Sequence, residues 1–182
     1  GSVTLTATGG TTAYQYSKDG ANFQSSNVFS GLTAGTYTFT VKDANNCLKT
    51  TSVTITQPDA LTLTGTSTDV KCNGETNGSI TLTAAGGKVA YQYSKDGTTF
   101  QSSNVFTGLT AGTYTLTVKD ANNCIKTTTV EVKQPDKLNA TPSKTDVTCY
   151  GGKDGSATVN VAGGKTPYSY KWNTGATTQT IS

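Results

Sequence analysis

The sequence predicts an all-β protein, a tandem array of immunoglobulin-like antiparallel β-sandwich repeats with a period of 77 residues. The first observation is repetition, because Gly31–Cys47 returns almost unchanged at Gly108–Cys124 and 53 of 77 positions are identical between the two periods. The second is the alternation of apolar side chains with threonine, which is typical of strands with one face in a core. The third is a turn signal about every 8 to 12 residues, with no helical periodicity.

Within the first period, the expected strands are short and closely spaced. Val3–Ala7 alternates apolar residues with threonine and ends at the turn-forming pair Gly9-Gly10. Tyr14–Tyr16 places two aromatic side chains on one face of the next strand. Lys18-Asp19-Gly20 predicts a hairpin turn, and Phe23–Leu32 is expected to supply one or two further strands.

The most regular strand lies inside the repeated segment. Tyr37, Phe39 and Val41 alternate with threonines, so they are expected to face the core. Asp43–Asn46 ends this strand in a turn, because Asp and Asn side chains accept hydrogen bonds from their own backbone. Leu48–Gln57 then predicts the last strand of the copy.

Proline marks the expected boundaries between copies. Pro58 has no N–H to donate to a strand ladder, so it belongs at a strand end or in a linker. A tight hairpin at this point would place Ile55 opposite Thr64 and turn Leu63 to the other face, which would separate the apolar residues. The expected domains are a first repeat that lacks its first strand (1–59), a complete second repeat (60–136) and the N-terminal part of a third (137–182).

Aromatic residues recur at fixed places in the period. We expect seven of them in the cores: Tyr14, Tyr16, Tyr37, Tyr91, Tyr93, Tyr114 and Trp172. An alternative for Tyr14, Tyr16, Tyr91 and Tyr93 is an exposed platform on which sugar rings stack.

The four cysteines are also locked to the repeat, and no histidine accompanies them, which favours disulfides of an exported protein over a zinc site. The preferred pairing is Cys72 with Cys124, which leaves Cys47 and Cys149 to partners outside this sequence. The alternative pairs Cys47 with Cys72 and Cys124 with Cys149, across the repeat boundaries. The entropy of loop closure does not separate the two schemes.

Composition argues against several function classes. The chain has no histidine and no arginine, which removes the commonest general base and the usual forked donor for phosphate and guanine. A net charge of +3 comes from scattered lysines, so no nucleic-acid partner is expected. No apolar run is long enough for membrane insertion.

No catalytic constellation is found, so we expect no enzyme activity and no cofactor. Structural calcium at the domain junctions is the one candidate ion, although no loop has the alternating acidic spacing of a dedicated calcium loop. Its candidate ligands are Asp43, Asp59, Asp120 and Asp136.

A family resemblance rests on a combination of motifs that returns at a fixed period. The order TDVKCNGETNGSITLTAAGG, YQYSKDG, GLTAGTYTLTVKDANNC and VEVKQP resembles the SprB repeats of large cell-surface adhesins from gliding Bacteroidetes. The resemblance implies export through the type IX secretion route to the outer surface of a Gram-negative cell, in association with the outer membrane. It also implies a long filament that the gliding machinery moves while exposed parts grip the substratum.

The sequence therefore predicts a structural and adhesive repeat segment of a filamentous adhesin. The expected partners are neighbouring repeats of the same chain, the substratum or a surface polysaccharide, and, by resemblance, the gliding and secretion machinery. An alternative is an accessory carbohydrate-binding or spacer module of a secreted polysaccharide-degrading enzyme, which would need the exposed tyrosine platform.

Overall fold

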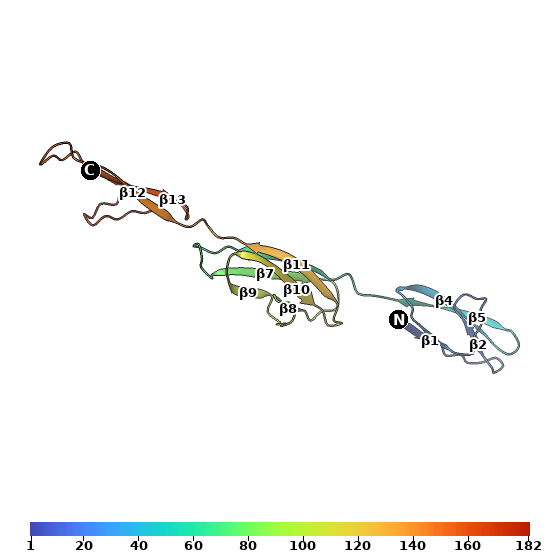
Figure 1. Cartoon of the computed structure of the whole chain (residues 1–182). Coiled ribbons are helices and arrows are strands. Elements are labelled where there is room, and N and C mark those ends of the chain that lie inside the picture. Colours follow the sequence, from blue (N-terminus) through green and yellow to red (C-terminus); the bar gives the residue numbers. More distant parts are fainter. The chain divides into compact units, whose positions relative to one another are not determined.

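The computed structural model describes residues 1–182 as strands, turns and loops without a helix, which confirms the all-β prediction (Figure 1). The strands are β1 (Ser2–Thr4), β2 (Gln15–Ser17), β3 (Val28–Ser30), β4 (Gly35–Lys42), β5 (Leu48–Ile55), β6 (Thr62–Thr68), β7 (Gly78–Ala85), β8 (Gln92–Ser94), β9 (Val105–Leu109), β10 (Gly112–Lys119), β11 (Ile125–Val132), β12 (Asn139–Thr145), β13 (Ser156–Ala162) and β14 (Thr180–Ile181). No helix is present that could cross a lipid bilayer.

The chain divides into two compact units, Gly1–Asp59 and Ala60–Ser182. This division falls where the proline rule places the first boundary. The second unit is not divided further at residue 136. The separation of the second and third copies into domains therefore stays a prediction.

The second copy, residues 60–136, forms an antiparallel sandwich of two three-stranded sheets, ordered β6-β7-β9 and β11-β10-β8. Apolar side chains fill the space between the two sheets, because every second side chain of a strand points to the same face. Ile80 and Leu82 of β7 and Leu116 and Val118 of β10 are completely buried in one apolar cluster. Thr81 and Thr115, on the other face of these strands, are exposed to solvent, whereas Thr117 is buried.

Strand β6 closes one side of this sandwich. It pairs antiparallel with β7, and its other edge lies beside β11. Gly65 makes this approach possible, since a Cβ at this position would lie 2.6 Å from Val130 Cγ2 and 2.9 Å from Leu82 Cδ2. The absence of a side chain at residue 65 thus brings the edges of the two sheets together.

The first unit repeats this plan with fewer strands. Its sheets are β2-β4-β5 and the two-stranded β1-β3, and no strand corresponds to β6. The core contains Val3, Tyr16, Phe29, Leu32 and Phe39. Phe29 and Phe39 are in contact, with ring centroids 5.0 Å apart.

The third copy contributes a sheet of order β12-β13-β14. β12 pairs with β13 from Asn139↔Ala162 to Thr145↔Ser156, in the same way as β6 pairs with β7. All seven residues of β12 are exposed.

Candidate functional site

An aspartate ties two turns together at one end of each sandwich. In the second copy the Asp120 carboxylate accepts hydrogen bonds from Lys88 N at 2.9 Å, Asn122 N at 2.9 Å and Cys124 N at 2.8 Å. Two of these donors belong to its own turn, and Lys88 follows the glycine pair Gly86-Gly87. One carboxylate therefore holds the β10–β11 turn against the β7–β8 turn.

In the first unit, Asp43 holds the two corresponding turns together in the same way, and we call this arrangement the aspartate clamp. Its carboxylate accepts from Thr11 N at 3.1 Å, Asn45 N at 2.9 Å and Cys47 N at 2.8 Å. Because these N–H groups favour the charged form, they hold the pKa of Asp43 below its ordinary value, and the bonds from Lys88 and Cys124 do the same for the pKa of Asp120.

A tyrosine hydroxyl closes the same glycine turn from the other side. Tyr91 Oη donates to the Gly86 carbonyl at 2.6 Å, and Tyr14 Oη donates to the Gly9 carbonyl at 2.6 Å. In the third copy Tyr168 Oη donates to Gly163 O at 2.5 Å. This contact is therefore a fixed structural feature of the repeat.

The Ser-Lys-Asp-Gly segment forms a self-contained turn in both sandwiches. The buried Ser94 hydroxyl donates to Asp96 Oδ1 at 2.8 Å and accepts from Gly97 N at 2.9 Å. Asp96 Oδ1 also accepts from Thr98 N at 2.8 Å and Thr99 N at 2.7 Å, and these donors lower the pKa of Asp96. Asp19 of the first unit makes the matching bonds, with the same direction of pKa shift.

A lysine covers an aromatic ring beside this turn. Lys119 Nζ lies 4.4 Å from the centroid of the Phe100 ring, and Lys42 Nζ lies 4.5 Å from that of Phe23. Such cation–π contacts stabilise exposed sites by about 0.5 to 1 kcal/mol. Both lysines are thus held against the loop by their own copy.

The cysteines are free and exposed in the structure, so none of the predicted disulfides is present. Cys124 directly precedes β11. Cys72 lies at the other end of that strand, because its loop is tied to the residues after β11 by the bonds from Asn73 Nδ2 to Pro135 O at 3.1 Å and from Gly74 N to Gln134 Oε1 at 2.9 Å.

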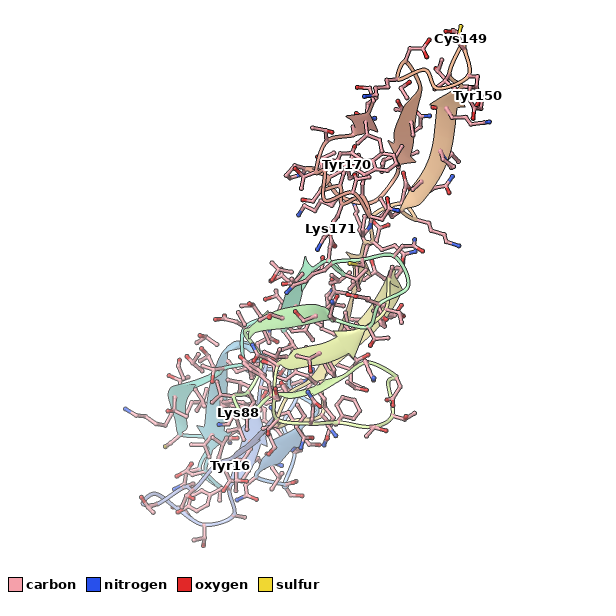
Figure 2. The ribbon with its side chains drawn as sticks, turned by 90° about the vertical axis from the view of Figure 1, so that its left-hand side faces the viewer. Tyr16, Lys88, Cys149, Tyr150, Tyr170 and Lys171 are labelled. Carbon is pink, nitrogen blue, oxygen red and sulfur yellow. The ribbon has the colours of Figure 1, made fainter.

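The preferred pairing of Cys72 with Cys124 is therefore not compatible with this fold. Eight residues of β11 separate the two ends, which corresponds to roughly 25 Å, whereas a disulfide needs Cα atoms within about 7 Å. The alternative pairs Cys47–Cys72 and Cys124–Cys149 depend on the placement of consecutive copies and stay predictions. Cys149, with the fully exposed Tyr150, lies at the tip of the loop after β12 (Figure 2).

The calcium candidates do not gather into a site. No group of three or more His, Cys, Asp or Glu side chains in the structure is arranged to hold a metal ion. Asp43 and Asp120 direct their carboxylates at backbone N–H groups, as described above, while Asp59 and Asp136 lie between strands β5 and β6 and between β11 and β12.

The aromatic candidates divide into buried and partly buried residues. Tyr16 and Tyr93 are 7% and 8% exposed, so their rings do not offer a sugar-stacking surface. Burial also raises the pKa of Tyr93. Four others are partly buried against the cores: Tyr14, Tyr37, Tyr91 and Tyr114.

Trp172 is partly buried in the third copy, and its indole N–H donates to the Thr178 carbonyl at 2.8 Å. It stands one period after Lys95, not after a core residue of the second copy. Trp172 and Tyr170 line an open cavity of about 710 Å³ together with Val159 and Val161 of β13.

The sequence does not reveal the hydrogen-bond donors to Asp43 and Asp120 that lie far away in the chain. It identified Asp43, Asp120 and the tyrosines, but not Thr11 and Lys88, whose contribution is a backbone N–H group. Every residue except proline has a backbone N–H group, so the residue type does not show which one donates. The buried Ser94 could have been found, because a serine two residues before Asp-Gly in both of the first two copies is a pattern typical of side-chain-bonded turns.

Comparison with known families gives two matches one period apart. Residues 64–99 and 141–177 match the model of the SprB repeat. Each match begins in the strand β6 or β12 and covers the cysteine loop and the glycine turn. The Gly108–Cys124 segment lies outside both matches, so the family model covers less of each copy than the resemblance in the sequence suggests.

No curated protein matches the chain. SprB repeats occur in surface-exposed, adhesin-like proteins. The matches, the 77-residue period and the recurring turns agree with one another. Two segments of the chain therefore match the SprB repeat, which is a module of cell-surface adhesin-like proteins.

Proposed function

We propose that this chain is a structural and adhesive segment of a large filamentous surface adhesin, similar to the SprB adhesin that is moved along the cell during gliding. In this role each copy adds length and mechanical continuity, and the segment carries out no chemical reaction. Its partners are neighbouring repeats, the gliding and type IX secretion machinery, and a substratum or surface polysaccharide that the parent protein contacts.

The observation that carries the proposal is the repetition of the same internal side-chain hydrogen bonds in the first two copies. The Asp120 and Asp43 clamps have the same donors, and Tyr91 and Tyr14 bond the same turn carbonyl. No buried side-chain nitrogen or oxygen is without a hydrogen-bond partner. A module whose polar side chains serve its own turns is suited to repetition in series, since each repeat can fold mainly on local contacts.

The surface location can be tested on intact cells. Antibodies raised against the 182-residue chain should label living, non-permeabilised cells of the source organism, and brief protease treatment of whole cells should remove the label. During gliding, the label should move along the cell body. Label that appears only after the cells are permeabilised would contradict the proposal.

The carbohydrate-binding alternative has a separate test. Calorimetric titration of the chain with soluble polysaccharides should give no heat of binding if the tyrosine rings pack into the cores and do not form an exposed platform. Saturable binding that Tyr91→Ala abolishes, and that Thr115→Ala on the outer face of β10 leaves intact, would favour the binding module over the stalk.

A further inference from the structure

The segment between β11 and β12, residues 133–138, joins the second copy to the third, and we call it the linker. The loop between β6 and β7, residues 69–77, is bonded to the linker, and we call this loop the linker brace. Lys133 N donates to Asp69 Oδ1 at 2.8 Å, and Val70 N donates to Lys133 O at 2.9 Å. The brace therefore bonds both backbone groups of the first residue of the linker.

The tip of the brace bonds the next two residues of the linker. Gly74 N donates to Gln134 Oε1 at 2.9 Å, and Asn73 Nδ2 donates to Pro135 O at 3.1 Å. Gly74 has φ 82°, in the left-handed region that glycine adopts without a steric penalty. Pro135 adds a restriction of its own, because its ring fixes φ at about −65°. One loop thus holds three successive residues of the linker.

Hydrogen bonds within the loop stiffen the brace itself. Asn77 Oδ1 accepts from Lys71 N at 3.0 Å, and Asn77 Nδ2 donates to the Glu75 carboxylate. Glu75 N donates to Cys72 O at 3.2 Å, which closes a turn at the tip. At the base of the loop, Val70 is 3% exposed and belongs to the core cluster of the second copy. The brace is therefore anchored in the sandwich to which it bonds the linker.

The glycine turn of the third copy holds the other end of the linker. Gly164 N donates to Asp136 O at 2.8 Å. A Cβ on Gly163 would overlap Lys137 O, and a Cβ on Gly164 would lie 2.8 Å from Leu138 Cδ1. The absence of side chains at the glycine pair therefore allows the linker to lie directly against this turn.

The parts of this joint recur with the period. Gln57-Pro58-Asp59 repeats Gln134-Pro135-Asp136 of the linker, and the second copy has its glycine pair at Gly86-Gly87. A Cβ on Gly87 would lie 3.3 Å from Cδ1 of Leu61, which stands one period before Leu138. The second and third copies thus hold the segment that enters them in the same way.

We propose that the linker brace makes the joint between the second and third copies rigid, so that these two copies turn as one body. Every residue from 133 to 138 is bonded to, or in close contact with, one of the two copies, and none is left as a free hinge. Residues 60–182 also form one compact unit. Linked domains ordinarily move relative to each other unless a large interface holds them. In this chain, bonds to the linker replace such an interface.

Several bonds must act together to give this rigidity. The three side-chain bonds between the brace and the linker are exposed, so each one alone contributes little. The length that a rigid joint adds to a stalk rests on the proposed function. The joint itself is measured on the purified chain, so a flexible joint and a failure of surface labelling are separate results.

Backbone dynamics of the complete 182-residue chain test the proposal. ¹⁵N relaxation gives an order parameter for each amide, which is about 0.85 in rigid backbone and below about 0.6 in a flexible segment. We expect the amides of Lys133, Gln134 and Asp136 to have the same order parameters as the amides of β11.

The variant that tests the brace carries three substitutions, Asp69→Ala, Asn73→Ala and Gln134→Leu. Together they remove the three side-chain bonds between the brace and the linker. The order parameters of the linker amides should fall below about 0.6, and the amide of Gly74 should exchange with solvent at least about tenfold faster. Unchanged amide shifts in β7 and β10 confirm that the sandwich is still folded.

Two single variants serve as controls. Gln134→Glu keeps an oxygen that can accept from Gly74 N, so it should retain the order parameters of the parent chain. Thr76 is an exposed residue of the same loop and takes no part in the bonds to the linker, so Thr76→Ala should also leave the linker rigid.

A distance measurement tests whether the two copies turn together. Spin labels on Cys124 and Cys149, with Cys47→Ser and Cys72→Ser to remove the other thiols, report the distance between the copies by double electron–electron resonance. The distance distribution should be narrow, and the triple substitution should widen it at least about twofold. The proposal is overturned by linker order parameters below about 0.6 in the parent chain, by distributions of equal width with and without the triple substitution, or by an equal loss of order in Thr76→Ala.

Discussion

Residues 1–59 and residues 78–136 are two stretches of nearly identical sequence with different burial. Val130 and Val132 of β11 are 9% and 1% exposed, but their counterparts Val53 and Ile55 are half-buried. The difference comes from one strand, β6, which lies beside β11 in the second copy and has no equivalent in the first unit. The burial of these side chains therefore depends on a strand that precedes the repeated segment, and the sequence of the repeated segment alone does not determine it.

The largest effect is expected where the two regions are alike. Leu116 and Phe39 occupy the same position of the period and are both completely buried. Leu116→Ala should lower the free energy of unfolding of its unit by about 3 kcal/mol, because it removes packing and leaves a cavity. Urea titration followed by NMR should assign this loss to the second unit alone. Phe39→Ala should produce a loss of similar size in the first unit, and a loss below about 1 kcal/mol at either position would contradict the common core.

The next effect is expected where the regions differ. Val132→Ala should cost about 2 kcal/mol, because the valine is almost fully buried. Ile55→Ala removes more atoms but should cost only about 1 kcal/mol, because that side chain is half-buried. Chemical denaturation of both variants gives the ranking. If Ile55→Ala is the more destabilising change, Ile55 is as well buried in solution as Val132. That result would contradict the difference in burial between the two regions.

A smaller effect concerns the tyrosine hydroxyls. Tyr91→Phe removes a hydrogen bond to Gly86 in a partly buried setting and should cost about 1 kcal/mol. Tyr14→Phe removes the equivalent bond in an exposed setting, so solvent replaces it and the cost should be about half as large. Thermal unfolding of the two variants measures the difference, with near-UV circular dichroism as a control for intact packing.

The smallest effect should appear only in acid. The folded-state pKa values of Asp120 and Asp43 lie below the ordinary value of 3.8, so below about pH 4 the unfolded chain binds protons that the folded chain does not. Stability is therefore complete above that pH and falls as the pH drops towards the folded-state values. The melting temperature should fall less between pH 5 and pH 3 for Asp120→Asn than for the parent protein. An equal fall in both proteins would show that Asp120 does not contribute to the acid sensitivity.

Much of the fold can be predicted from local patterns. The alternation of Tyr114, Leu116 and Val118 with threonines predicts β10 and its inward face, because side-chain direction in a strand depends only on position. The turn from Asp120 to Cys124 is predictable for the same reason, since its Asp and Asn side chains act on their own backbone. The location of Asn123 in the left-handed region, at φ 62°, is a conformation that asparagine tolerates.

Local patterns predict the strands and the turns, which arise from residues a few positions apart, and the 77-residue period predicts the repeat. The tertiary fold is needed to place Cys72 and Cys124 at opposite ends of β11, to bring Asp120 to the amide of Lys88, and to pack β6 beside β11 at Gly65. The physical reason is that these relations join residues 32 to 65 positions apart. Strand order and register decide which of these distant residues meet. The two-residue alternation of side chains alone does not specify either of them.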